Sequence, residues 1–246
     1  MPRKSTPFDP SKVRFSRTSV DVFLKCPRCF YLKMRGITAP TLPFTLNSAV
    51  DALLKAEFDQ HRLNGTVPNL LEANGLSLVP ANNQSLGVLV GSRPKVTTEY
   101  KGFTFEGSLD DVWLDQNQTG YVVDYKATAK KDPVIALDLT TPHHQSYVNQ
   151  VAFYVWLLRQ GGHSISDTCY FVYATGDNTQ PAFEDTMRFR THLIAHQVDC
   201  SWVPAVLDQL LDCHHQPHPP AAHEKCALCA YVLKYNHLCL VPKALL

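Results

Sequence analysis

Two short groups of charged residues lie within an otherwise apolar, strand-like stretch near the middle of the chain. Asp110 and Asp111 are adjacent, and Asp124 and Lys126 follow with one residue between them. Because side chains alternate faces along a strand, Asp124 and Lys126 are expected on the same side, about 7 Å apart. On the preceding strand, either Asp110 or Asp111 can face that side.

This combination of side chains is typical of metal-assisted hydrolysis. A partly buried pair of carboxylates is costly without a counter-charge, and a divalent cation removes that cost. Mg²⁺ and Mn²⁺ prefer oxygen ligands, and a nearby lysine can orient water or stabilise charge on a phosphate. The set therefore predicts phosphodiester hydrolysis. For Asp124 and Lys126 taken alone, a surface ion pair is the alternative.

A further signal lies on the helix that periodicity predicts at about residues 145–159. Gln150 and Tyr154 are one helical turn apart and share a face with apolar residues. A glutamine in an apolar stripe needs a hydrogen-bond partner. That partner is either an internal group near the helix end or the acidic site itself.

The elements that position these residues follow from the apolar pattern. Five segments are predicted to be strands: 96–100, 103–114, 121–127, 168–174 and 187–193. The first three follow one another across short turns, so an antiparallel meander is expected. Residues 168–174 are mostly apolar, which predicts a strand buried on both faces.

Helices are expected on both sides of these strands. Residues 18–34 have helical periodicity that Pro27 interrupts, and residues 46–62 carry an apolar stripe. Ser201 can begin another helix near the end of the chain. Residues 65–95 mix turn formers with short apolar runs and are expected to be mostly loop.

These elements predict a single α/β domain over residues 1–246. Its core is a mixed central sheet flanked by helices, at about residues 96–195. The N-terminal helices, residues 16–64, and the C-terminal segment, residues 200–246, are expected to pack together. A cysteine metal site is expected to join them.

Composition limits the function classes. The chain has 246 residues, 45% of them hydrophobic, and a formal net charge of +1, so it can form a core but has no strong global field for nucleic acid or membrane. It has no apolar window of about 18 residues, no secretory signal and no GxxxxGK[ST] phosphate loop. We expect a cytoplasmic protein without a membrane partner, whose cysteines are reduced thiols or metal ligands.

Two C-x-x-C pairs lie towards opposite ends of the chain. Cys26 and Cys29 form the first pair, Cys226 and Cys229 form the second, and Cys239 follows. Two thiolates at this spacing can reach one ion, so the two pairs together are compatible with a zinc site. A shared metal would join the two ends, and its binding free energy would stabilise the fold.

The order of these motifs resembles the PD-(D/E)XK nuclease superfamily. It looks most like the RecB-type branch, which includes CRISPR-associated and AddB-like nucleases. The resemblance is carried by G-x-x-D at residues 107–110, V-V-D-Y-K at residues 122–126 and Q-x-x-x-Y at residues 150–154. It implies a restriction-endonuclease-like core.

The resemblance also implies roles for individual residues. Asp110 and Asp124 would ligate Mg²⁺ or Mn²⁺, and Lys126 would be the catalytic lysine that positions the attacking water. Gln150 and Tyr154 would shape the site and contact the DNA strand.

The family arrangement includes two further metal ligands, a backbone carbonyl and a histidine, and this chain has a different residue in place of the histidine. The carbonyl of Tyr125 would ligate the metal in the family arrangement. RecB-type relatives often have a metal-binding histidine on a helix near the N-terminus, and Asp51 stands at the equivalent position. Asp51 is either a third oxygen ligand or an acid at the edge of the apolar stripe that reaches water.

The cysteines resemble the iron–sulfur site of AddB-like nucleases, which use one N-terminal and three C-terminal ligands. C-P-R-x-x-Y-L at residues 26–32 is similar to their first-ligand motif. The resemblance implies a [4Fe–4S] cluster held by Cys26, Cys226, Cys229 and Cys239, and this is the favoured assignment. Structural zinc, with Cys29 in place of Cys239, is the alternative.

The function that the resemblance implies is Mg²⁺- or Mn²⁺-dependent cleavage of single- or double-stranded DNA. DNA repair, recombination or CRISPR-type processing is the expected setting, with a helicase or another DNA-processing protein as a candidate partner. The alternative is a catalytically inactive nucleic-acid-binding or scaffold protein on the same fold, which Asp51 in place of histidine favours.

Overall fold

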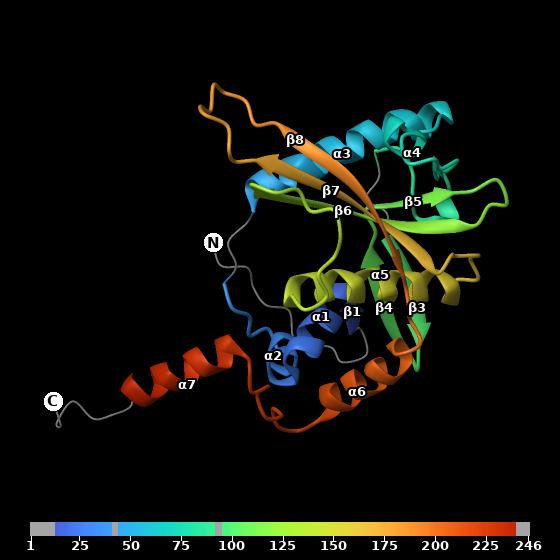
Figure 1. Ribbon diagram of the computed structural model, residues 1–246. Coiled ribbons are helices and arrows are strands. Elements are labelled where there is room, and N and C mark those ends of the chain that lie inside the picture. Colours follow the sequence, from blue (N-terminus) through green and yellow to red (C-terminus); the bar gives the residue numbers. More distant parts are fainter. Residues whose placement is uncertain (1–12, 41–43, 92–94, 240–246) are drawn as a thin grey trace, which may run out of the picture. The chain divides into compact units, whose positions relative to one another are not determined.

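The computed structural model describes residues 13–40, 44–91 and 95–239, with the backbone alone for residues 236–239 (Figure 1). The chain divides into two compact units. One comprises Met1–Leu42 and Trp202–Leu246, and the other comprises Pro43–Ser201. Within the described residues, no helix combines the length and the apolar character that a membrane crossing requires.

The larger unit is built on a five-stranded mixed sheet with the order β2-β5-β6-β7-β8 (Figure 1). Its strands are β2 (Val79–Pro80), β5 (Asp111–Leu114), β6 (Gly120–Lys130), β7 (Thr168–Asp177) and β8 (Phe189–Gln197). β6 and β7 are parallel, and the other neighbouring pairs are antiparallel. A parallel pair needs a crossover, which α5 (Pro142–Gln160) provides. The predicted mixed sheet with flanking helices is confirmed.

The predicted strand at residues 103–114 is in fact two strands. β4 (Phe103–Ser108) pairs with β3 (Lys95–Tyr100), whereas β5 pairs with β6. Leu109 and Asp110 lie between β4 and β5, outside both strands. The predicted three-stranded meander was therefore wrong. The alternating apolar pattern runs through this break, and only the strands paired on each side decide where the chain changes sheet.

Helix α3 (Thr45–Asn64) covers one face of the five-stranded sheet. Its buried residues Val50, Leu54 and Phe58 belong to a core cluster with Trp113 and Tyr125. The rings of Phe58 and Trp113 stack with their centroids 5.3 Å apart. The predicted helix at residues 46–62 is thus present, and its apolar stripe is what attaches it to the sheet.

Helix α5 packs on the other face of β6 and against the β3–β4 hairpin. Its residues from Val151 to Leu158 are all buried. β7 is buried on both faces, as its apolar sequence predicted. The segment before β3 is mostly irregular, with the short helix α4 (Asn69–Glu72) and the 3-10 turn η2 (Gln84–Leu86).

The smaller unit contains segments from both ends of the chain. Its elements are β1 (Arg14–Ser16), α1 (Arg17–Lys25), α2 (Pro27–Lys33), α6 (Val203–His215) and α7 (Ala227–Cys239). The expected interruption at Pro27 separates α1 from α2, with proline in the first turn of α2. Phe15 lies edge-on to His214 with ring centroids 5.3 Å apart, and Cys213 of α6 donates to the Pro27 carbonyl.

Candidate active site

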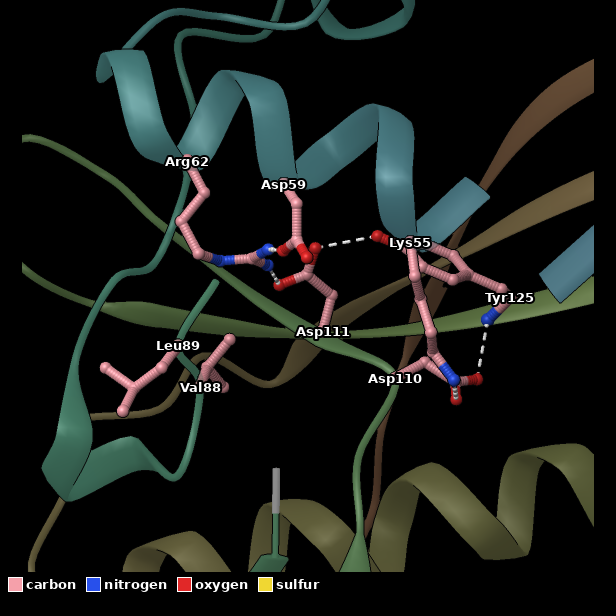
Figure 2. A pocket seen from close by; sticks show the side chains of 8 residues that line it. All are labelled: Lys55, Asp59, Arg62, Val88, Leu89, Asp110, Asp111 and Tyr125. Atoms are coloured by element: carbon pink, nitrogen blue, oxygen red, sulfur yellow. Dashed lines mark hydrogen bonds and ion pairs between the residues drawn. The ribbon is translucent and has the colours of Figure 1, made fainter. Parts of the chain in front are cut away.

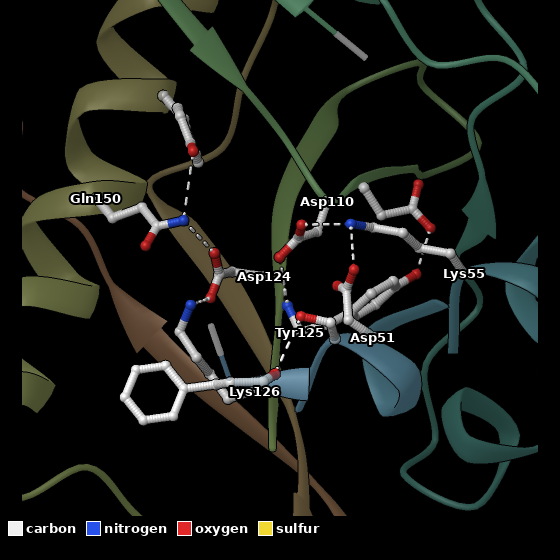
Figure 3. Close-up of polar contacts among 11 residues, drawn as sticks. Asp51, Lys55, Asp110, Asp124, Tyr125, Lys126 and Gln150 are labelled. Atoms are coloured by element: carbon white, nitrogen blue, oxygen red, sulfur yellow. Dashed lines mark hydrogen bonds and ion pairs between the residues drawn. The ribbon is translucent and has the colours of Figure 1, made fainter. Parts of the chain in front are cut away.

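Asp110 and Asp124 lie next to each other, Asp110 immediately before β5 and Asp124 within β6. β5 begins at Asp111, which pairs with Val123 of β6. One residue earlier, Asp110 therefore lies opposite Asp124. The backbone N–H of Tyr125 donates to Oδ2 of Asp110 at 3.0 Å, so this carboxylate reaches β6. Figure 3 shows the two acids as neighbours, as the sequence predicted for one of the Asp110–Asp111 pair.

Asp124 is fully buried and held by two side chains. Lys126 forms an ion pair with its Oδ2, and the amide of Gln150 donates to its Oδ1 at 2.6 Å. Asp124 and Lys126 thus share one side of β6, as the alternation predicts. The Lys126 ammonium also lies 4.4 Å from the centre of the Tyr147 ring, within the range of a cation–π contact.

Helix α5 brings Gln150 and Tyr154 to this face together. Nε2 of Gln150 lies 3.3 Å from the Tyr154 hydroxyl as well as close to Asp124. The Tyr154 ring rests on Gly107 of β4, where an added Cβ would come within 2.6 Å of Cε1 of the ring. Glycine permits this close approach of helix and strand. The G-x-x-D and Q-x-x-x-Y motifs are therefore in direct contact.

Asp111 faces the other side of the sheet and has a different set of partners. It forms a buried ion pair with Arg62 of α3, and it accepts hydrogen bonds from the Tyr125 hydroxyl at 2.7 Å and from the Trp113 indole at 3.3 Å. Burial raises the pKa of Asp111, whereas the charge of Arg62 and the hydrogen bond from the Tyr125 hydroxyl act in the opposite direction. The structure thus separates the two adjacent acids: Asp110 lies with Asp124, and Asp111 ties the sheet to α3.

A small cavity lies between α3 and β5 (Figure 2). Its lining consists of Lys55, Asp59, Arg62, Val88, Leu89, Asp110, Asp111 and Tyr125. Arg62 pairs with both Asp59 and Asp111, and Asp59 also accepts from the Gly91 N–H at 2.8 Å. Since Arg62, Asp59 and Asp111 bind one another, we assign their part of the cavity to the packing of α3 against the sheet. Lys55 and Asp110, which also line it, belong to the candidate active site.

Lys55 of α3 is the residue of this site that sequence reasoning missed. Its ammonium lies 2.8 Å from Oδ1 of Asp110 and 2.9 Å from Oδ2 of Asp51 (Figure 3). Burial acts to lower the pKa of Lys55, but the two carboxylates outweigh it and raise that pKa. The one signal in the sequence was the i, i+4 spacing of Asp51 and Lys55.

Asp51 is therefore connected to Asp110 through Lys55. Among the residues that the structure describes, the carboxylates of Asp51, Asp110 and Asp124 do not form a set within 4.8 Å of one another. Lys55 bridges Asp51 to Asp110 instead.

The smaller unit brings the two C-x-x-C pairs together. Sγ of Cys29 lies 3.6 Å from Sγ of both Cys226 and Cys229, and Sγ of Cys26 lies 3.9 Å from that of Cys229. All four sulfurs lie within 4.8 Å of one another. The cysteines thus join the N-terminal and C-terminal helical segments, as predicted.

The thiols of this cysteine group differ in acidity. Burial acts to raise the pKa of Cys26, but hydrogen bonds from the His223 backbone and from neighbouring cysteines outweigh it and lower that pKa to about 7. Burial is the largest cause that raises the pKa of Cys229 to about 11. The side chain of Cys239, at the end of α7, lies outside the described residues.

One of the comparisons with known proteins identifies a family. A profile of the PD-(D/E)XK nuclease superfamily matches residues 46–233, a range that includes Asp110, Asp124 and the Q-x-x-x-Y helix. No curated protein matches the chain. Among solved structures, the crystal structure of SSO0001 is similar over 87% of this chain and 81% of that chain, with 14% identity and a TM-score of 0.40. Because the superfamily profile spans well over half of its residues, the chain belongs to the PD-(D/E)XK nuclease superfamily.

Proposed function

We propose that this chain is a Mg²⁺- or Mn²⁺-dependent deoxyribonuclease. Its active site, where phosphodiester bonds are hydrolysed, would be formed by Asp110, Asp124 and Lys126. The observation that carries the proposal is the adjacency of Asp110 and Asp124, with Lys126 ion-paired to Asp124. Membership of the superfamily supports metal-dependent nuclease activity.

The donor atoms at this point of the sheet fit a hard divalent cation. Two carboxylates, from Asp110 and Asp124, lie beside the backbone of Tyr125, whose carbonyl is a third oxygen donor. We propose these three groups as the ligands. The ion would lower the pKa of a bound water and offset the charge that develops on the phosphate.

The remaining side chains of the site orient these groups. The Gln150 amide fixes Oδ1 of Asp124, which sets the direction of the other carboxylate oxygen. Lys126 is held between Asp124 and the Tyr147 ring, and 13% of its side chain is exposed. We propose that its ammonium positions the attacking water, and that Gln150 and Tyr154 shape the site and contact the DNA strand.

Replacing Lys126 tests this assignment. We expect Lys126→Met to lower the cleavage rate by about 10²–10⁴-fold, the range for loss of a positioned proton-transfer group. The measurement is cleavage of labelled single- and double-stranded DNA by the purified chain, with and without Mn²⁺. Lys130→Met is the matched control, since Lys130 is an exposed lysine on the same strand.

Two results would contradict the proposal. One is wild-type cleavage that persists in EDTA, and the other is a Lys126→Met variant as active as Lys130→Met. A wild-type chain that binds DNA but cleaves neither DNA nor RNA would favour the second candidate, an inactive nucleic-acid-binding protein. The acid at position 51, where RecB-type relatives often have a metal-binding histidine, is the observation that favours this candidate.

We propose that the two compact units make up one nuclease domain, because the superfamily match runs from the larger unit into residues of the smaller one. The order of the D, D-x-K and Q-x-x-x-Y motifs supports a place in the RecB-type branch. A net charge of +1 offers little attraction for DNA, which supports a helicase or another DNA-processing protein as a partner.

For the cysteines, we propose structural zinc held by Cys26, Cys29, Cys226 and Cys229. Four sulfurs at about 2.3 Å from one tetrahedral ion stand about 3.8 Å apart. The separations of 3.6 and 3.9 Å agree with that value. In a cubane cluster each thiolate binds a different iron, so its sulfurs stand further apart.

The position of Cys239 supports the same choice. Within α7, Cys239 follows Cys229 by ten residues, which corresponds to about 15 Å along a helix axis. Cys29, by contrast, already has its sulfur 3.6 Å from Cys226 and Cys229. The zinc assignment therefore replaces the iron–sulfur assignment as our proposal.

A further inference from the structure

Lys55 divides the oxygens of Asp110 between two directions. Oδ1 binds the Lys55 ammonium at 2.8 Å, whereas Oδ2 accepts from the Tyr125 N–H on the side of β6 (Figure 3). Asp110 thus lies between two groups. The Lys55 ammonium is on the side of α3, and Asp124 is on the side of the sheet. In two-metal nucleases, two ions about 3.5–4 Å apart take such positions on either side of the reacting phosphate.

We propose that Lys55 is a built-in second cation of the active site. Its ammonium takes the place of a second divalent ion, so that the site holds one divalent ion only, at Asp110 and Asp124. Asp51 is then a positioning residue that holds Lys55 and not a metal ligand. The inference rests on the proposed nuclease function and specifies how many ions that function uses.

The charges of the site support one ion. Asp51, Asp110 and Asp124 face two ammonium groups, Lys55 and Lys126, which leaves one net negative charge. A single divalent cation reverses that charge and prepares the site for a phosphodiester. A second would have to displace Lys55 from two carboxylates that lie within 2.9 Å of it.

Lys55 is also accessible enough to act on a substrate. Its side chain is 35% exposed, and that of Asp51 is 38% exposed, so the bridge lies at the surface of the site. An ammonium fixed there can stabilise charge on a phosphate oxygen without the reorganisation that a mobile ion requires. Asp51 and Asp110 fix its direction from two sides.

The number of bound ions tests the proposal directly. We would measure Mn²⁺ stoichiometry by electron paramagnetic resonance on the full chain, without DNA. The wild type is expected to bind one Mn²⁺ that Asp124→Asn abolishes. Lys55→Met keeps the length of the side chain but frees two carboxylates, so it is expected to bind two. Adding Asp51→Asn to Lys55→Met should remove the second ion.

Lys25→Met is the matched control. Lys25 forms the same i, i+4 pair on a helix, with Asp21 at 2.8 Å, but lies in α1 of the smaller unit. The Lys25→Met variant should still bind one Mn²⁺ ion. The Mn²⁺ dependence of the cleavage rate gives a second readout, which should change from hyperbolic in the wild type to sigmoidal in Lys55→Met.

Two Mn²⁺ ions in the wild type, or one in a folded Lys55→Met variant, would overturn the proposal. If Lys55→Met does not fold, Asp51→Asn decides the matter: retention of one ion supports the proposal, and loss of that ion makes Asp51 a ligand and overturns it. A chain without Asp124-dependent Mn²⁺ binding would instead refute the proposed nuclease function, and the role of Lys55 would fall with it.

Discussion

At the scale of single residues, the active site depends on side chains that differ in environment although they are adjacent in sequence. Asp110 is ion-paired to Lys55 and bound by the Tyr125 N–H, whereas Asp111 is buried with Arg62. Surface ion pairs contribute little to stability, but a buried charge that loses its partner is costly. Substitution of Asp111 should therefore lower stability much more than substitution of Asp110.

Asp110→Asn and Asp111→Asn form a matched pair that tests this difference. Asp111→Asn leaves Arg62 with less counter-charge in a buried site, so we expect it to lower the free energy of unfolding by about 3–5 kcal/mol. Asp110→Asn should change that free energy by about 1 kcal/mol or less but abolish metal-dependent DNA cleavage. Urea denaturation and a cleavage assay on both variants provide the measurements. Equal losses of stability would contradict the separation.

At the scale of elements, the packing of α5 against β4 depends on the absence of a side chain at Gly107. Tyr154 occupies the space that a Cβ would need, and Gln150 on the same helix holds Asp124. The contact of Tyr154 with Gly107 is therefore separated from the hydrogen bond of Gln150 to Asp124 by only one turn of α5. A larger residue at position 107 should disturb both stability and catalysis.

We expect Gly107→Ala to lower the free energy of unfolding by about 1–3 kcal/mol, the usual cost of overpacking, and to reduce cleavage. The neighbouring Ser108→Ala, at an exposed position, is the control. In a Tyr154→Ala background the cost of Gly107→Ala should fall, because the ring that the Cβ meets is gone. A double-mutant cycle in urea measures this coupling. Strict additivity would show that the Tyr154 contact is not what requires glycine.

At the scale of the whole molecule, the cysteines join the two ends of the chain into one unit. α2 supplies Cys26 at its N-cap and Cys29 in its first turn, and the C-terminal segment supplies Cys226 and Cys229. Because such a site does not exist in the unfolded chain, the free energy of metal binding contributes to folding. Loss of the metal should therefore act mainly on the smaller unit.

We expect the purified chain to be colourless, to contain one zinc, and to lose thermal stability when a strong chelator removes that zinc. Elemental analysis and calorimetry are the measurements. Cys29→Ser should reduce the zinc content and the melting temperature, whereas Cys200→Ser, outside the group, should change neither. Brown protein that contains iron and inorganic sulfide would refute the zinc assignment.

Much of this protein follows from its sequence alone. Hydrophobic periodicity located α3, α5 and the strand that carries both Asp124 and Lys126, since these elements depend on contacts between near neighbours in the chain. Motif order indicated the superfamily, and the two C-x-x-C pairs indicated a site that joins the termini. The mixed sheet followed from the alternation of strands and helices.

Tertiary structure decided the rest. The break at Leu109 and Asp110, the separation of Asp110 from Asp111, and the place of Lys55 depend on which strands pair and which helix covers each face. Lys55 meets Asp110 across 55 positions of the chain, and Cys29 meets Cys226 across 197. Local propensity carries no information over such separations, because these contacts form only when the whole fold buries its apolar faces.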